Sequence, residues 1–239
     1  MKPKDIADTD RLIFALDVPD TDSARALVEQ LGDAVTFYKL GLELCMSGGY
    51  FELLDWMVAK DKKIFVDLKF FDVPATVASA VRNLNGRGVT YATIHGNQSI
   101  MEAAGEAKGD VKILAVTALT SLDRGDLDDL GFDCDVRELV LSRARRSLEA
   151  GCDGVISSGL EVAALREAVD DKLIVITPGI RPVENRPADD QKRVVTVEDA
   201  FRNGADHIVV GRPIRNADDP RAAAQAIQNS IAAVMAELR

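Results

Sequence analysis

Short apolar runs recur along the chain and are separated by segments with a helical pattern. Most of these runs are continuous in apolar residues rather than alternating, which is typical of strands buried on both faces of a parallel sheet. They span residues 12–17, 35–41, 63–69, 89–96, 111–119, 153–158, 173–179 and 207–212. The pattern therefore predicts eight parallel strands.

The segments between the runs carry apolar residues at a 3.6-residue period and predict helices. The helix expected at 21–31 has Thr21 or Asp22 as its N-cap. Pro74 lies in the first turn of another helix, where its missing N–H costs nothing. Further helices are expected at 73–85, 135–151, 196–204 and about 219–238, two of them ending at a glycine.

A strand followed by a helix, repeated along 239 residues, predicts the α/β class and a (β/α)8 TIM barrel. We expect one barrel domain over 1–239, because no Gly-, Pro- or Ser-rich linker divides the chain. An open doubly wound sheet is the alternative, but no GxGxxG follows the first strand. The insertions 120–135 and 181–193 would be loops at the C-terminal rim, where barrel enzymes keep their sites. We expect the acidic stretch 123–135 to be a solvated loop.

The composition excludes several kinds of partner. The net charge of −10 argues against a nucleic-acid or membrane surface, because binding phosphates requires a basic excess. No apolar run approaches the roughly 18 residues of a membrane span, and the N-terminus lacks the apolar core of a signal peptide. Cys45, Cys134 and Cys152 show no CxxC spacing, so we expect buried structural thiols and no zinc site. These features predict a cytoplasmic protein.

Polar side chains stand at the C-terminal ends of most predicted strands. They are Asp17, Lys39, Asp67, Lys69, Asp72, Thr120, Arg181 and Arg212. Any one of them alone fits a surface or ion-pair role. Five strand ends loaded with charge are harder to explain in that way, because unpaired buried charge is costly. We therefore expect these side chains to meet at the barrel mouth, the end at which the strands terminate.

The densest group of charges lies at 67–72. Asp67 and Lys69 are two residues apart on a strand, so both should point to the same face. Lys39 could complete an alternating Lys–Asp–Lys–Asp array with Asp72, in which each charge stabilises its neighbours. One interpretation is a plain salt-bridge network. The other is a pre-organised electrostatic site with a lysine as the acid.

The motif Asp-x-Lys-x-x-Asp at 67–72, with Val73-Pro74 and Thr76-Val77 after it, resembles the signature of the orotidine 5'-phosphate decarboxylase family. Sister enzymes share this motif, so it is only moderately specific. The remaining matches occur in the family's order and make the whole set highly specific. They are ALD at 15–17, YKLG at 38–41, LTS at 119–121, TPGIR at 177–181, Gln191 and VVGRPI at 209–214.

The resemblance implies decarboxylation of orotidine 5'-monophosphate to uridine 5'-monophosphate in de novo pyrimidine biosynthesis, without a cofactor or a metal. Lys69 is similar to the catalytic lysine that protonates the carbon vacated by CO₂. Asp67 and Asp72 resemble the two carboxylates beside that lysine, with Asp72 supplied by the other subunit of a homodimer with shared active sites. Lys39 is similar to the second lysine of the array.

The resemblance also implies how the substrate is bound. Asp17 is similar to the residue that binds the ribose hydroxyls, and Lys39 also contacts the substrate. Thr120 and Ser121 correspond to the region that contacts the pyrimidine, and Thr76 resembles a ribose or phosphate contact from the partner chain. The residues that resemble the family's phosphate-binding residues are Arg181, Gln191, Gly211 and Arg212.

Two other functions remain open. A sister decarboxylase or aldolase for sugar phosphates resembles this fold and motif but uses Mg²⁺. In that pattern a carboxylate that helps to hold the metal replaces Lys39, and a lysine there would repel the ion. A barrel that only binds a phosphorylated ligand is the second alternative, although binding phosphate requires neither Asp67 nor Lys69. His95 and His207 are expected to serve packing or hydrogen bonding.

Overall fold

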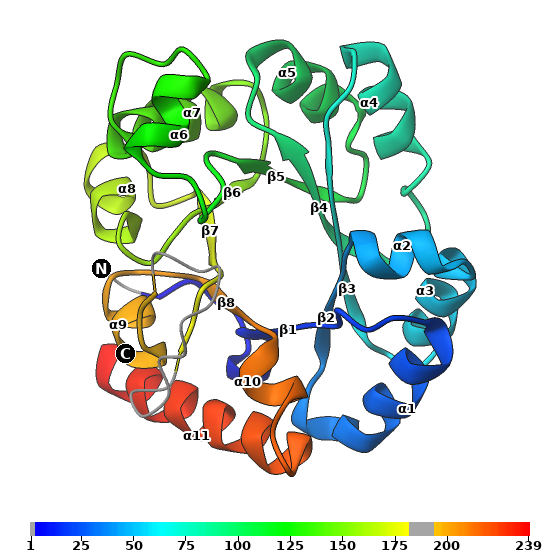
Figure 1. The fold of residues 1–239 in the computed structure, drawn as a ribbon. Helices are drawn as coiled ribbons and strands as arrows, with labels where there is room; N and C mark the ends of the chain where they lie inside the picture. Colours follow the sequence, from blue (N-terminus) through cyan, green and yellow to red (C-terminus); the bar gives the residue numbers. More distant parts are fainter. Residues whose placement is uncertain (1–2, 182–193) are drawn as a thin grey trace.

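The computed structural model describes residues 3–181 and 194–239. Within these segments eight parallel strands form a closed barrel in chain order, ringed by helices (Figure 1), and β8 pairs with β1 to close it. The strands are β1 (Leu12–Ala15), β2 (Phe37–Leu40), β3 (Lys63–Phe70), β4 (Val89–His95), β5 (Lys112–Val116), β6 (Gly154–Ile156), β7 (Ile174–Thr177) and β8 (His207–Val210). The predicted TIM barrel is confirmed, and the open sheet is excluded.

The helices follow the strands around the outside of the barrel. They are α1 (Thr21–Leu31), α2 (Leu42–Ser47), α3 (Tyr50–Val58), α4 (Pro74–Arg82), α5 (Gln98–Ala107), α6 (Arg124–Asp129), α7 (Val136–Glu149), α8 (Val162–Ala168), α9 (Val197–Arg202), α10 (Arg212–Arg215) and α11 (Pro220–Leu238). Short 3₁₀ turns, η1 (Asp8–Asp10) and η2 (Gly32–Ala34), precede β1 and β2.

Three local expectations require correction. The N-cap of α1 is Asp20, whose carboxylate accepts from the Ser23 N–H at 2.7 Å, and not Thr21 or Asp22. The stretch 123–135 is not only a solvated loop, because a capping box between Asp123 and Asp126 starts α6. The three cysteines are free, but only Cys152 is fully buried. Burial raises the pKa of its thiol to about 12.

Side chains of each strand point alternately into the barrel and out toward the helices. On β1, Ile13 belongs to the inner cluster, while Leu12 and Phe14 belong to the outer one. The inner cluster consists of aliphatic and aromatic side chains and includes Phe37, Phe65 and Tyr91. No helix of the described residues is long and apolar enough to cross a bilayer.

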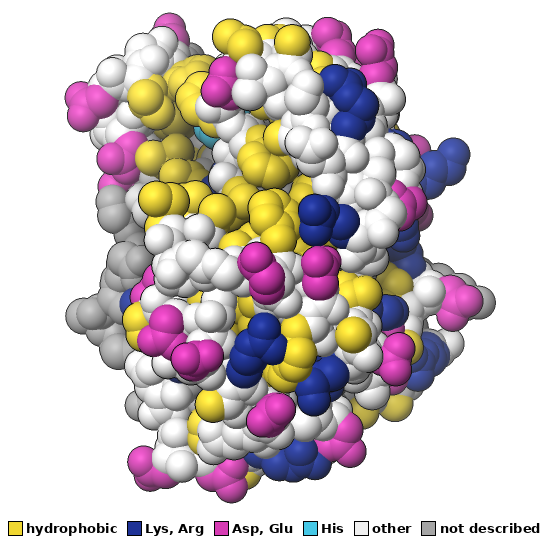
Figure 2. Space-filling model, turned by 90° about the vertical axis from the view of Figure 1, so that its right-hand side faces the viewer, with side chains coloured by type: hydrophobic (Ala, Val, Ile, Leu, Met, Phe, Trp, Pro, Cys, Tyr) yellow, Lys and Arg dark blue, Asp and Glu magenta, His cyan; other side chains and the backbone are white. Residues whose placement is uncertain are grey.

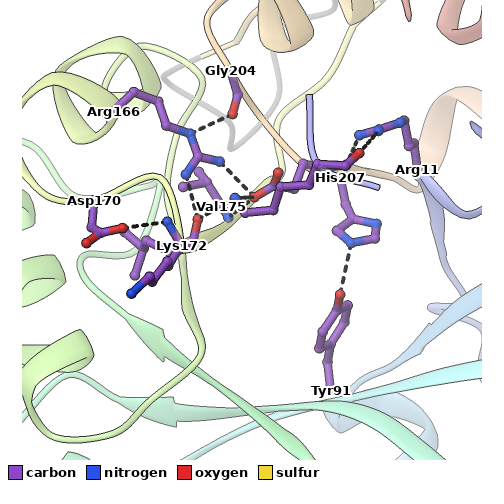
Figure 3. Close-up of polar contacts among 11 residues, drawn as sticks. Arg11, Tyr91, Arg166, Asp170, Lys172, Val175, Gly204 and His207 are labelled. Carbon is purple, nitrogen blue, oxygen red and sulfur yellow. Dashed lines mark hydrogen bonds and ion pairs between the residues drawn. The ribbon is translucent and has the colours of Figure 1, made fainter. Parts of the chain in front are cut away.

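A buried histidine lies at the N-terminal end of the barrel (Figure 3). His207 Nδ1 is 2.9 Å from the Asp10 carbonyl oxygen. Its Nε2 is 2.9 Å from the Tyr91 hydroxyl. A carbonyl only accepts, so Nδ1 carries the proton and Nε2 accepts from Tyr91. Burial lowers the pKa of His207 to about 4. This ring is therefore neutral near pH 7 and has the structural role expected of it.

The base of the barrel also holds a buried ionic network (Figure 3). The Asp206 carboxylate accepts from Arg166 at 2.7 Å, from the Val175 N–H at 2.9 Å and from Lys4 at 2.8 Å. Arg166 also donates to the Gly204 carbonyl at 2.9 Å. These bonds tie the N-terminal segment and α8 to the seam between β7 and β8. Stabilising contacts thus gather at the end of the barrel opposite its mouth.

The neutral state of His207 should make stability depend on pH. The unfolded histidine has a pKa near 6.5 and the folded one a pKa of about 4, so the unfolded chain binds the proton first as the pH falls. The stabilisation is complete above pH 6.5 and is lost toward pH 4, by about 3 kcal/mol. The free energy of unfolding, measured with urea, should depend less on pH in His207→Gln than in the wild type over this range. His95→Gln is the control. If the unfolding free energy of His207→Gln changed with pH as steeply as that of the wild type, His207 would not be the group responsible.

Candidate active site

A cavity of about 560 Å³ opens at the C-terminal ends of the strands. Its floor is apolar, with Phe65 of β3 and Val209 of β8 among the lining residues. Its walls are polar. Nine of the residues singled out in the sequence line it: Asp17, Lys39, Asp67, Lys69, Thr120, Ser121, Arg181, Gly211 and Arg212. The barrel mouth therefore brings together side chains that are far apart along the chain.

Four charged side chains form a continuous alternating chain on one side of the cavity. The Lys39 ammonium is 3.0 Å from Asp17 Oδ1 and 3.5 Å from Asp67 Oδ2. The Lys69 ammonium is 2.9 Å from Asp67 Oδ1. The side chains of Lys39 and Asp67 are 12% and 11% exposed, whereas that of Lys69 is 35% exposed. Of the two lysines, Lys69 is thus the more accessible to a ligand.

The two buried members of the charged chain, Lys39 and Asp67, stabilise each other's charge. Burial alone lowers the pKa of Lys39, but the carboxylates of Asp67 and Asp17 outweigh burial and raise it. Burial alone raises the pKa of Asp67, but the ammonium groups of Lys39 and Lys69, with hydrogen bonds from Lys69 and Thr93, lower it. Both groups are therefore charged at neutral pH.

Lys69 reaches the cavity by an irregular route. Val66 pairs with Ala92 and Phe70 with Ile94, so residues 67–69 of β3 stand opposite a single residue of β4. Lys69 has a φ of 48°, in the left-handed region that lysine rarely adopts. Asp67 and Lys69 nevertheless both line the cavity, while Leu68 packs against the outer cluster, so the expectation that the two charged residues share a face is confirmed. The bulge interrupts the pairing of β3 with β4 at these residues.

Two of the residues singled out in the sequence lie outside the cavity of their own chain. Asp72 is exposed, and its carboxylate accepts from the N–H of Val73 at 2.6 Å. Thr76 is exposed on α4. The structure thus joins Lys39, Asp67 and Lys69 but leaves Asp72 apart from them. Gln191 lies outside the described residues.

Arginines supply another part of the cavity wall. Arg181 follows β7 and is buried, with one guanidinium N–H donated to the Ile180 carbonyl at 2.9 Å. Arg212 begins α10 directly after Gly211. A side-chain carbon at Gly211 would lie 3.3 Å from the Ala15 Cβ, which is a tight fit. In strand order, the arginines of β7 and β8 are separated from the lysines of β2 and β3 by β1, which carries Asp17.

Sequence reasoning missed three residues of this region. Glu43 of α2 and Arg215 of α10 line the cavity, and Arg215 donates to the Asp17 carbonyl. Arg215 stands three residues after Arg212, a spacing that could have suggested a shared helix face. Thr93 of β4 bonds to Asp67, and nothing in the sequence marks it. No group of three or more His, Cys, Asp or Glu side chains in the described part of the chain could hold a metal ion.

Comparison with known proteins assigns the fold and motifs to a family. A model of the "Orotidine 5'-phosphate decarboxylase / HUMPS family" matches residues 10–227. The chain belongs to this family. The resemblance drawn from the sequence motifs is therefore confirmed, and the matched region contains all eight strands and all the residues of the charged chain.

Individual relatives of this family match over nearly the whole chain. A protein of Methylococcus capsulatus is 69% identical over 98% of this chain and 96% of its own length. A protein of Stenotrophomonas maltophilia is 51% identical over 98% of each. Both are named orotidine 5'-phosphate decarboxylase, a carboxy-lyase, which agrees with the predicted class of enzyme. The crystal structure of a protein with the same name from Lactobacillus acidophilus has a TM-score of 0.82 at 34% identity, covering 93% of this chain and 99% of its own.

Proposed function

We propose that this protein is an orotidine 5'-phosphate decarboxylase that converts orotidine 5'-monophosphate to uridine 5'-monophosphate in pyrimidine biosynthesis, as one barrel domain in the cytoplasm. The observation that carries the proposal is that the charged chain Asp17–Lys39–Asp67–Lys69 lines one cavity together with Arg181 and Arg212. A nucleoside monophosphate has its reacting base and its dianion at opposite ends. The cavity likewise has its lysines at the ends of β2 and β3 and its two arginines after β7 and β8.

Lys69 is the proposed proton donor. The bond between C6 of the pyrimidine and its carboxylate breaks, CO₂ leaves, and the electron pair remains on C6. A fixed ammonium group stabilises that pair as it develops and then gives C6 a proton. Asp67, 2.9 Å from the Lys69 ammonium, holds it in place. In this scheme no cofactor or metal takes part.

The other lining residues are proposed to bind the rest of the substrate. Asp17 and Lys39 would bind the ribose hydroxyls, and Thr120 and Ser121 the pyrimidine. The phosphate would be held by Arg181, Gln191, Arg212 and the backbone of Gly211. Binding energy from this remote phosphate can hold the base against the charged chain, where it would not rest by itself.

The complete site is proposed to form only in a homodimer, with Asp72 and Thr76 entering the partner's cavity. Asp72 lies between Phe71 and Val73, whose side chains are 66% and 62% exposed, and Met46 of α2 is 82% exposed. In Figure 2, hydrophobic side chains gather on this flank of the barrel. Exposed apolar patches of this kind are typical of protein interfaces.

Turnover of orotidine 5'-monophosphate, followed by the loss of its ultraviolet absorbance, tests the function. We expect decarboxylation that exhaustive chelation with EDTA leaves unchanged. A loss of activity that Mg²⁺ restores would favour the sugar-phosphate alternative, although Lys39 opposes a metal there. Binding without turnover would favour a barrel that only holds a phosphorylated ligand. We propose no nucleic-acid or membrane partner.

Replacing Arg212 by alanine tests the phosphate site. We expect kcat/KM to fall on the order of 10²-fold, because a planar set of charge-assisted hydrogen bonds to the dianion is lost. Arg202→Ala is the matched control, since Arg202 is an exposed arginine of α9 paired with Glu237 at 2.9 Å. If the two variants had equal kinetics, Arg212 would have no role in binding phosphate.

A further inference from the structure

The hydroxyl of Thr93 links the side chain of Asp67 to the backbone of Lys69. Thr93 lies in β4 and is fully buried. Its Oγ1 is 2.8 Å from Asp67 Oδ1 and 3.0 Å from the backbone nitrogen of Lys69. The amide can only donate, so the hydroxyl accepts from Lys69 and directs its single proton at Asp67. One hydroxyl group therefore makes two bonds with a fixed direction.

These bonds occur at the bulge in β3. Thr93 is the residue of β4 that stands opposite residues 67–69. The Lys69 N–H bonds to the Thr93 side chain in place of a strand carbonyl, at the residue with the left-handed φ of 48°. A left-handed lysine is unfavourable and persists only where its surroundings hold it. Thr93 is the part of those surroundings that contacts the Lys69 amide.

We propose that Thr93 is a positioning residue for the decarboxylation. Its hydroxyl holds the Lys69 backbone in the bulged conformation and fixes the Asp67 carboxylate, so that the Lys69 ammonium stays beside Asp67 and faces the cavity. Thr93 does not line the cavity and acts only through these two residues. The inference rests on the proposed function, since the reaction that Lys69 serves is part of that proposal.

Thr93→Val keeps the shape of the side chain and removes both bonds. We expect kcat to fall on the order of 10- to 100-fold, the range for a hydrogen bond to a charged group, while KM changes by less than about threefold. Thr93→Ser, which retains a hydroxyl, should recover most of kcat. Thr117→Val is the matched control, because Thr117 is also buried and its hydroxyl donates to the Ile156 carbonyl at 3.0 Å. It should keep kcat within about twofold.

The pH profile separates positioning from a purely structural role. Asp67 faces the ammonium groups of Lys39 and Lys69, and Asp17 lies beyond Lys39. Loss of the Thr93 bond makes the carboxylate form of Asp67 less favourable. The acid limb of kcat/KM should therefore move to higher pH in Thr93→Val. It should not move in Thr117→Val.

Acetylation of Lys69 by acetic anhydride, measured by peptide mass spectrometry, tests positioning without the reaction. We expect the labelling of Lys69 relative to the exposed Lys60 to rise about threefold or more in Thr93→Val. In Thr93→Ser this ratio should be close to that of the wild type. Should the valine variant not fold, Thr93→Cys replaces it, since a thiol is a weak donor of similar size.

The outcomes distinguish the two proposals. If the wild type turns over substrate but kcat, the acid limb and the labelling are all unchanged in the valine variant, Thr93 has no positioning role. Equal losses in Thr93→Val and Thr117→Val would lead to the same conclusion. If the wild type does not turn over orotidine 5'-monophosphate, the proposed function is wrong, and the labelling still decides whether Thr93 holds Lys69.

Discussion

Replacement of Lys69 by alanine is expected to lower kcat/KM for orotidine 5'-monophosphate by about four orders of magnitude. Proton donation by a positioned side chain contributes roughly 10²- to 10⁴-fold, and a fixed cation at a developing negative charge contributes a comparable factor. Lys69 would supply both, and its ammonium is held 2.9 Å from Asp67 at the edge of the cavity. Spectrophotometric initial rates over a range of substrate concentrations measure the loss.

The control for this variant removes the same charge elsewhere. Lys112 is exposed at the start of β5, at the end of the barrel opposite the cavity. Lys112→Ala should retain the activity of the wild type within about twofold. Thermal unfolding of both variants checks that the barrel is intact. A folded Lys69→Ala protein with activity within tenfold of the wild type would remove Lys69 from the proposed role.

Mixing two inactive variants is expected to restore activity if Asp72 acts in the partner's cavity. Lys69→Ala and Asp72→Ala should each be nearly inactive as homodimers. In a mixed dimer, one of the two sites has both native residues and the other has neither. Random exchange of subunits makes about half of the dimers mixed, so about a quarter of the wild-type activity should return. Activity is measured after exchange in dilute denaturant and refolding.

The matched control for this experiment mixes Lys69→Ala with Asp67→Ala. Asp67 and Lys69 contact each other within one chain, so no mixed dimer of that pair has a complete site. Recovery in the first mixture and none in the second would support a shared site. No recovery in either mixture, with subunit exchange verified by mass spectrometry, would contradict a shared site.

The barrel could be predicted from the sequence because the patterns that mark its strands and helices are local in the chain. Apolar runs and helical periods depend on neighbouring residues, and they marked β3 at 63–69 where the structure has Lys63–Phe70. Helix ends were less certain, because Asp20, Thr21 and Asp22 are all good caps and only the backbone conformation selects Asp20. The acidic stretch that contains α6 was predicted as a loop from its many charges, and the capping box that starts the helix was overlooked.

The sequence by itself determined which strands end in charge, and hence that Lys39, Asp67 and Lys69 would meet at one mouth. Only the tertiary structure decided how they meet. The bulge at 67–69 and the contact of Thr93 depend on how β4 pairs with β3, which is a long-range choice of register. The outward position of Asp72 likewise depends on where the chain leaves β3 to start α4. Local patterns specify elements, whereas closure of the barrel specifies the distances between charges on which the chemistry depends.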